Sequence, residues 1–162
     1  MIKAIVLPTD PLLPVRVLDH DETDPRAAQA LVGGLIQPVT LSGAASRLYV
    51  NLHGKDFGLP PNGRATLLTW MYAPELRGHH DIAGGAFLTG AFDTDAPADL
   101  VALLTGAVPA RVQTRSHRRP DRWITVSQTV PTVYGEPFDA YATALLALNN
   151  PHTLDARVIP RQ

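Results

Sequence analysis

Short apolar segments that end at proline or glycine limit the fold of this chain most. The sequence contains 15 prolines and 12 glycines, and proline interrupts both helices and central strands. One such segment, Ile2–Leu7, is rich in β-branched residues and stops at Pro8, which predicts a strand. No apolar run approaches the roughly 18–20 residues that a membrane-spanning helix needs. We therefore expect a soluble, cytoplasmic protein built from short strands and helices, without a membrane partner.

Length and composition set the domain size and exclude several kinds of chemistry. A chain of 162 residues makes one domain, or one domain with an appended subdomain. It contains no cysteine, which excludes disulfides, thiol catalysis and cysteine-based zinc or iron–sulfur sites. The formal net charge of −1 provides no overall attraction to nucleic acid or to a membrane surface. We expect neither a cofactor nor a metal.

The first two thirds of the chain alternate between segments typical of strands and segments typical of helices. Val15–Leu18 is expected to pair antiparallel with the first strand. Asp24 before Pro25 indicates a helix start, and the glycine pair after Val32 indicates its end. Further strands are expected at Leu35–Leu41, Ser46–Leu52, Lys55–Leu59 and Ile82–Phe92, and further helices at Gly63–Met71 and Ala98–Leu104.

The last third is expected to contain a strand, a helix and a tail. Trp123–Val133 has the composition of a strand, interrupted by Pro131. Pro137–Leu148 has the apolar spacing of an amphipathic helix. The last twelve residues, 151–162, are predicted to be a loosely held tail.

Together these elements predict an α+β fold. We expect a mixed, mostly antiparallel sheet with two or three helices packed on one face, plus a C-terminal strand-helix extension. The expected domain covers residues 1–93. Residues 94–162 form the extension, which packs on that domain or on a second copy of the chain.

Four segments of the first 93 residues carry a resemblance to a known family. They are Leu31-Val32-Gly33-Gly34-Leu35-Ile36, Leu48-Tyr49-Val50-Asn51, Gly58-Leu59-Pro60-Pro61-Asn62 with Ala65-Thr66, and Ile82–Leu88. In order and spacing they resemble a family of small bacterial and bacteriophage proteins classed as a domain of unknown function. Gln37 and His53 stand where the family's usual form has acidic residues. The resemblance implies a compact α+β fold and a bacteriophage or mobile-element setting, and it supplies no catalytic residues.

The strongest local charge lies between Arg111 and Arg122, where five arginines stand against Asp121. Arginine beside an aromatic residue is typical of protein interfaces, and it also suits phosphate contacts and stacking on nucleic-acid bases. A solvated hairpin explains the stretch as well. It also offers a docking site for the acidic segment Asp19–Asp24, either of the same chain or of a second copy, and the second arrangement would give a homo-dimer. The candidate partner-binding residues are Arg111, Arg115, Arg118, Arg119, Arg122 and Trp123.

A second candidate site uses polar residues around the glycine-rich strand. Asn62 and Arg64 stand at a predicted helix start, where free amides and an arginine can hold an anion; a plain N-cap explains Asn62 as well. His79 and His80 form the one compact metal-capable cluster, but no His-x-x-x-His spacing supports it. We therefore predict no metal site there.

The sequence contains no nucleophile elbow and no phosphate-binding loop, which favours a non-enzymatic role. We expect a bacteriophage or mobile-element protein that binds and modulates a host protein in the host cytoplasm. The first alternative is a small-molecule-binding, anion-binding or enzymatic domain around Asn62, Arg64, His79 and His80. The second is nucleic-acid binding through the loop expected at Arg111–Arg122.

Overall fold

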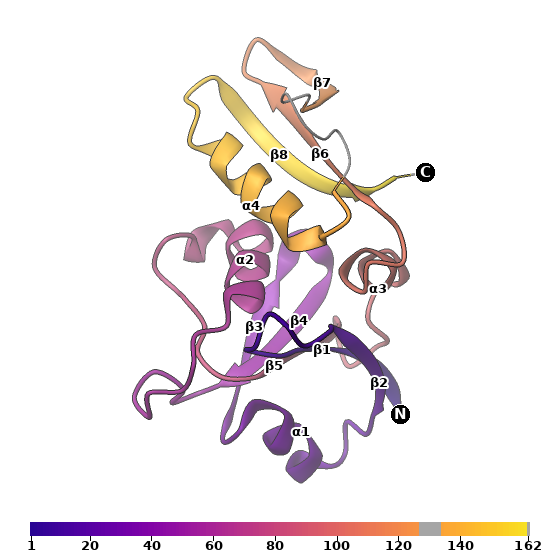
Figure 1. Cartoon of the computed structure of the whole chain (residues 1–162), viewed down its shortest axis with the longest axis vertical. Coiled ribbons are helices and arrows are strands. Elements are labelled where there is room, and N and C mark those ends of the chain that lie inside the picture. The colour runs from indigo at the N-terminus through magenta and orange to yellow at the C-terminus, as the bar shows by residue number, and fades with distance from the viewer. Residues whose placement is uncertain (127–133, 162) are drawn as a thin grey trace. The chain divides into compact units, whose positions relative to one another are not determined.

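The structure, a computed structural model, describes residues 1–126 and 134–161. In this part of the chain it contains two antiparallel sheets and four α-helices, so the predicted α+β class is confirmed (Figure 1). The strands are β1 (Ile2–Leu7), β2 (Arg16–His20), β3 (Ile36–Leu41), β4 (Ser46–Asn51), β5 (Ala86–Gly90), β6 (Ala110–Ser116), β7 (Arg119–Thr125) and β8 (Thr153–Pro160). The helices are α1 (Pro25–Val32), α2 (Gly63–Tyr72), α3 (Ala98–Leu104) and α4 (Pro137–Leu148).

The chain divides into two compact units, Met1–Val101 and Ala102–Gln162, and the division falls within α3. The boundary predicted at residue 93 lies before this division, and the packing of the extension on the domain or on a second copy stays a prediction. Charge is distributed unevenly between the units. The first unit has seven lysines and arginines against eleven acidic residues, and the second has seven arginines against four. Their formal charges are therefore −4 and +3.

The first unit is built on a five-stranded sheet in the order β2-β1-β5-β4-β3, with every neighbouring pair antiparallel. One face of this sheet packs against α1. Ala4 and Val6 of β1 and Phe87 of β5 form a buried cluster with Ala28 and Val32 of α1. Burying aliphatic and aromatic side chains in this way stabilises the unit by about 25 cal/mol per Å² of apolar surface removed from water.

The other face of the same sheet is buried as well. Successive side chains of a strand point to opposite faces, and Ile5 and Leu7, which alternate with the α1 cluster, are fully buried. Helix α2 lies on the side of the sheet away from α1 (Figure 1), and its Ala65 and Leu68 are fully buried. The helices of the first unit therefore lie on both sides of the sheet, whereas the sequence analysis placed them on one, because β1 is apolar on both faces.

Both of these helices begin at the capping residues that the sequence predicts. Asp24 caps α1, and its carboxylate accepts hydrogen bonds from the first free amides of the helix. Gly33 ends α1 in the left-handed conformation at φ 78°, which glycine adopts without steric cost. Asn62 caps α2 in the same way. Caps of this type typically contribute about 1 kcal/mol to stability.

The second unit is a three-stranded sheet in the order β7-β6-β8, covered by α4. Strand β6 is central and runs antiparallel to both neighbours. Val112 of β6 and Val158 of β8 face each other in the register and are buried. Phe138 and Tyr141 of α4, which packs on these two strands, are buried too. The C-terminal strand and helix of the predicted extension are therefore present.

The predicted C-terminal tail is wrong. Residues 153–160 form β8, which pairs with β6 from Ala110 opposite Pro160 to Arg115 opposite Asp155. The buried Ala156 alternates with exposed and half-buried neighbours, which is the pattern of a strand with one covered face. This alternation is short and places charged residues between the apolar ones, so it resembles the sequence of a solvated end.

Two strand predictions in the first unit also need correction. Lys55–Leu59 is not a strand but a series of turns, in which the Leu59 amide donates back to the Gly54 carbonyl at 2.9 Å. Gly58 has a φ of +65° there, which a strand residue does not adopt. The strand predicted at Ile82–Phe92 is shorter, Ala86–Gly90, and Phe92 turns out of it at φ 56°. The strand predicted at Trp123–Val133 is described only to residue 126; residues 127–133 lie outside the described residues.

Candidate functional site

The basic stretch between Arg111 and Arg122 is a β-hairpin of the second unit, not a loop. Strands β6 and β7 form its arms, and a turn at residues 117–118 joins them. The hairpin register shifts between Thr114 and Ser116, so a bulge interrupts β7. Strand β7 is an edge strand, and a bulge, a proline and charged side chains are common protections of such an edge against unwanted pairing. Arginines on this edge therefore have a structural use that does not depend on a partner.

Two of the predicted partner-binding residues interact within their own sheet. Arg115 forms an ion pair with Asp155 of β8 at 3.1 Å. The guanidinium groups of Arg115 and Arg157 lie over the Trp123 ring, 4.8 and 4.1 Å from its centre. Arg157 also donates two hydrogen bonds to the side-chain oxygen of Gln113, at 2.9 and 2.7 Å. These contacts tie β7, β6 and β8 together, and the Trp123 ring already makes the stacking contact that a base would need.

Three other arginines of the hairpin remain available. Arg118, Arg119 and Arg122 are exposed, and their side chains have no hydrogen-bond or ion-pair partner within the described part of the chain. Ile124 is 52% exposed and lies two residues after Arg122 on β7. We call Arg118, Arg119, Arg122 and Ile124 the basic hairpin surface. The sixth predicted residue, Arg111, is half-buried, and its Nε atom is buried without a partner among residues 1–126 and 134–161.

A cavity of about 320 Å³ lies beside the hairpin turn. Its lining residues are Ser116, His117, Arg118, Pro151 and His152. The amide of His117 donates to the carbonyl of His152 at 3.3 Å, which joins the turn to the loop before β8. The lining side chains supply two imidazoles, a guanidinium and a hydroxyl. The cavity therefore adds hydrogen-bond donors for an acidic group next to the basic hairpin surface.

The polar groups of Asn62 and Arg64, predicted as an alternative ligand site, hold the first unit together. Asn62 is fully buried, and its amide nitrogen donates to the carbonyls of Leu7 and Gly84 at 2.9 and 3.0 Å. Its side-chain oxygen accepts from the Ala65 amide at 3.0 Å. Arg64 donates to two carbonyls of the β1–β2 connection, at 2.6 and 2.8 Å. These contacts favour the capping explanation that the sequence analysis left open.

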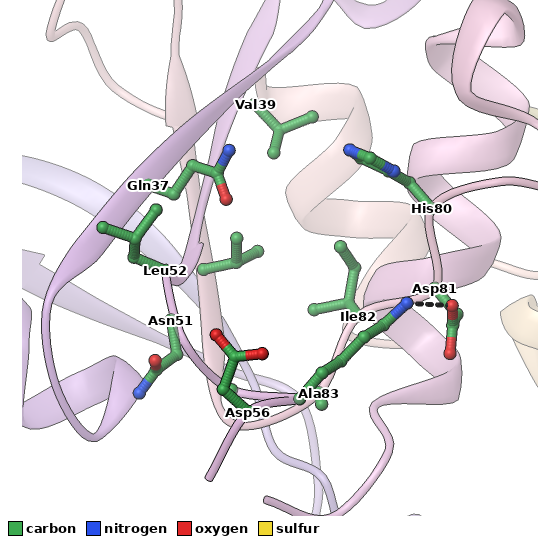
Figure 2. A pocket seen from close by; sticks show the side chains of 12 residues that line it. Gln37, Val39, Asn51, Leu52, Asp56, His80, Asp81, Ile82 and Ala83 are labelled. Atoms are coloured by element: carbon green, nitrogen blue, oxygen red, sulfur yellow. Dashed lines mark hydrogen bonds and ion pairs between the residues drawn. The ribbon is translucent and has the colours of Figure 1, made fainter. Parts of the chain in front are cut away.

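His80 lines a separate cavity of about 210 Å³ in the first unit, seen from close by in Figure 2. We call it the β3–β4 cavity. Its lining residues are Gln37, Val39, Val50, Asn51, Leu52, Gly54, Lys55, Asp56, His80, Asp81, Ile82 and Ala83. In Figure 2 the side chains of Gln37 and His80 point into the cavity from opposite sides, with Val39 and Ile82 between them. His79 does not line this cavity.

Helix α2 and close backbone packing hold the walls of the β3–β4 cavity in place. The indole of Trp70 donates to the His80 carbonyl at 2.7 Å, and the Ile82 amide donates to the Thr66 hydroxyl at 2.9 Å. Gly54 packs directly against Ala83, where a Cβ would lie 2.2 Å from the carbonyl oxygen. Only glycine permits this approach of the two walls.

Charged side chains stand at the mouth of the same cavity. Lys55 and Asp81 form an ion pair (Figure 2), and hydrogen bonding to Lys55 is the main cause that lowers the pKa of the Asp81 carboxyl. Asp56 lies 3.2 Å from the His53 imidazole. No group of three histidine or acidic side chains within the described ranges is arranged to hold a metal ion.

Sequence reasoning did not select Lys55, Gln37 or Arg157 as site residues. The β3–β4 cavity combines β3, the turns after β4 and the loop before β5, so no local motif marks it. Arg157 stood in the segment predicted as a tail. Alternation of apolar residues around Ala156 and Val158 was the available signal for that strand.

Comparisons with known proteins identify a family for this chain but no reaction. No helix among the described residues has the length and hydrophobicity to cross a bilayer. Searches of the curated proteins and of the solved structures gave no significant match. Residues 2–105 match the profile of a family described as a domain of unknown function, DUF3846. The match covers more than half of the chain and agrees with the resemblance seen in residues 1–93, so the chain belongs to this family.

Proposed function

We propose that this chain is a non-enzymatic binding protein whose second unit docks on an acidic surface of another protein. The observation that carries the proposal is the basic hairpin surface, where three arginines with no side-chain partner among the described residues accompany an exposed isoleucine. Arginine is enriched among the residues that dominate binding energy at protein interfaces. The donor-lined cavity beside the turn supplies a place for a carboxylate of the partner.

Two observations favour a protein over a nucleic acid as the partner. The Trp123 ring is stacked with Arg115 and Arg157, so it contributes less to base stacking. Three arginines, opposed by the neighbouring Asp121, neutralise few phosphates, and nucleic-acid affinity rises with the number of phosphates neutralised. The bacteriophage or mobile-element setting implied by the resemblance would make the partner a host protein that the chain modulates.

The test is capture of partners from a bacterial lysate by the tagged chain, with and without nuclease, read by mass spectrometry. The variant carries Arg118→Glu and Arg119→Glu. Its matched control carries Arg16→Glu and Arg26→Glu, which make the same change in charge at exposed positions of the first unit. We expect one protein to be retained in near-stoichiometric amount after nuclease by the wild type and the control. The hairpin variant is expected to retain at least tenfold less.

Three results would contradict the proposal. Loss of the captured partner on nuclease treatment would show a nucleic-acid-mediated interaction. Equal capture by the hairpin variant and the control would show that the basic hairpin surface does not contribute to the interaction. Capture of only a second copy of this chain would indicate self-association in place of a host partner. The first unit's formal charge of −4 would then attract the basic hairpin surface of the other copy.

A further inference from the structure

The β3–β4 cavity contains polar groups that the fold does not use. The Gln37 carboxamide and the His80 imidazole point into it from opposite sides (Figure 2). Neither side chain has a hydrogen-bond partner within residues 1–126 and 134–161. Asn51, by contrast, donates to the Val32 carbonyl at 3.2 Å and accepts from the His53 amide at 2.8 Å. Gln37 and His80 are exposed, so their polar groups are accessible to solvent and to a ligand alike, whereas the buried Asn51 is used by the structure.

The charged side chains at the mouth of the cavity determine which charged groups of a ligand they can bind. Two carboxylates, Asp56 and Asp81, stand with one ammonium group, that of Lys55, and Asp56 also lies 3.2 Å from the His53 imidazole. This balance disfavours a phosphate or another polyanion and favours a molecule that carries an ammonium group. The side chains of Lys55 and Asp81 are 54% and 64% exposed, and an exposed ion pair contributes only about 0–1 kcal/mol. A ligand with both charges can therefore replace this pair at little cost.

The floor of the cavity is apolar and small. Val39, Val50 and Ile82 line it and are buried in the fold, with exposed fractions of 8%, 4% and 6%. With a volume of about 210 Å³, this space accepts a short aliphatic side chain.

We propose that the β3–β4 cavity binds a small zwitterion with an aliphatic group, the chemical class of free aliphatic amino acids. The ligand's ammonium group pairs with Asp56 and Asp81, and its carboxylate pairs with Lys55. Its aliphatic group lies on Val39, Val50 and Ile82. Apolar lining with a few convergent polar groups is the usual composition of a small-molecule site. This site belongs to the first unit and is independent of the proposed partner surface.

Methyl NMR of the full chain tests this proposal with defined probes. Leucine is titrated against protein labelled at its isoleucine, leucine and valine methyl groups. Two further probes each lack one charged group: isopentylamine has no carboxylate, and 4-methylpentanoate has no ammonium. We expect leucine to shift the methyl signals of Val39, Val50 and Ile82 in a saturable way, at least tenfold more tightly than either probe. Asp56→Asn and Lys55→Met should each weaken leucine binding at least tenfold.

The matched controls are Asp99→Asn and Lys3→Met, which make the same charge changes away from the cavity. They should leave the affinity for leucine within twofold of the wild type. The proposal is overturned if leucine at about 10 mM leaves the methyl signals of Val39, Val50 and Ile82 unchanged. It is also overturned if isopentylamine binds as tightly as leucine, or if Asp99→Asn weakens binding as much as Asp56→Asn. Partner capture by the basic hairpin surface is unaffected by any of these outcomes.

Discussion

The polar residues predicted to bind a ligand at the start of α2 and those predicted to bind a partner in the β6–β7 hairpin are used differently. At the start of α2, Asn62 bonds to three backbone atoms and Arg64 donates to two carbonyls. In the second unit, Arg115 is paired in the same manner, whereas Arg118 and Arg119 at the hairpin turn are not paired within the described residues. The comparison teaches that the net charge of the whole chain does not reveal its binding surfaces, because a total of −1 is the sum of an acidic unit and a basic one.

The largest effect on stability is expected at Asn62. Asn62→Ala removes the cap of α2 and the hydrogen bonds to two carbonyls in the buried interior. We expect the free energy of unfolding to fall by about 3 kcal/mol, measured by urea denaturation followed through Trp70 fluorescence. The control is Asp24→Ala, an exposed cap of α1, for which we expect a loss of about 1 kcal/mol. Equal losses would contradict the distinction between a buried, fully bonded cap and an exposed one.

The next largest effect on stability is expected at Trp123, in the second unit. Trp123→Ala removes a half-buried ring and its contacts with two guanidinium groups. Amide hydrogen exchange of β6 should report a stability lower by about 2 kcal/mol. The neighbouring exposed Ile124 serves as the control, since Ile124→Ala should change the same exchange rates by less than about 0.5 kcal/mol. If both substitutions had the same effect, Trp123 would not have the structural role assigned to it.

A substitution at Arg115 tests whether the arginines paired within the second unit stabilise it more than the exposed arginines do. Arg115→Met breaks the ion pair with Asp155 and one contact with the Trp123 ring, and we expect it to destabilise the second unit by about 1 kcal/mol. Arg119→Met is the matched control and should change stability by less than about 0.5 kcal/mol. A stability loss at Arg119 equal to that at Arg115 would erase the difference between these two groups of arginines.

The smallest predicted effect concerns the pH response of Asp81. Hydrogen bonding to Lys55 lowers the pKa of this carboxyl, so the pair stabilises the fold at pH values above the ordinary carboxyl range. That contribution is lost as the pH falls through the lowered pKa. Lys55→Met should raise the Asp81 pKa back toward its ordinary value in a carboxyl NMR titration. Lys3→Met is the control, and an Asp81 titration that does not move in Lys55→Met would contradict the assigned cause.

Local signals predicted most elements of this fold, and their success has physical reasons. The cap at Asp24 and the glycine pair after Val32 predicted the limits of α1 to within a residue or two, because helix ends depend on their immediate neighbours. The helix predicted at Pro137–Leu148 has the observed bounds of α4. In contrast, the apolar residues of β8 alternate with charged ones over only part of its length, and its partner β6 lies about 40 residues earlier, so pairing across the chain decides its structure.

The candidate sites were less predictable than the elements. The sequence indicated the right basic stretch, but the division between Arg115 and Arg118 depends on Asp155 and Arg157, which only the fold brings close. The β3–β4 cavity depends on the approach of Gly54 to Ala83. Such an approach leaves no trace in local spacing.

The measurement that tests the central claim most directly combines thermal unfolding with partner capture for Arg118→Glu/Arg119→Glu, using nuclease-treated lysate. The account predicts a melting temperature within about 2 °C of the wild type, because neither side chain has a partner to lose in the part of the chain that the structure describes. It predicts at the same time a reduction in captured partner of at least tenfold. A variant that captures its partner as well as the wild type does, or one that loses capture only because it has lost its fold, would contradict the role assigned to the basic hairpin surface.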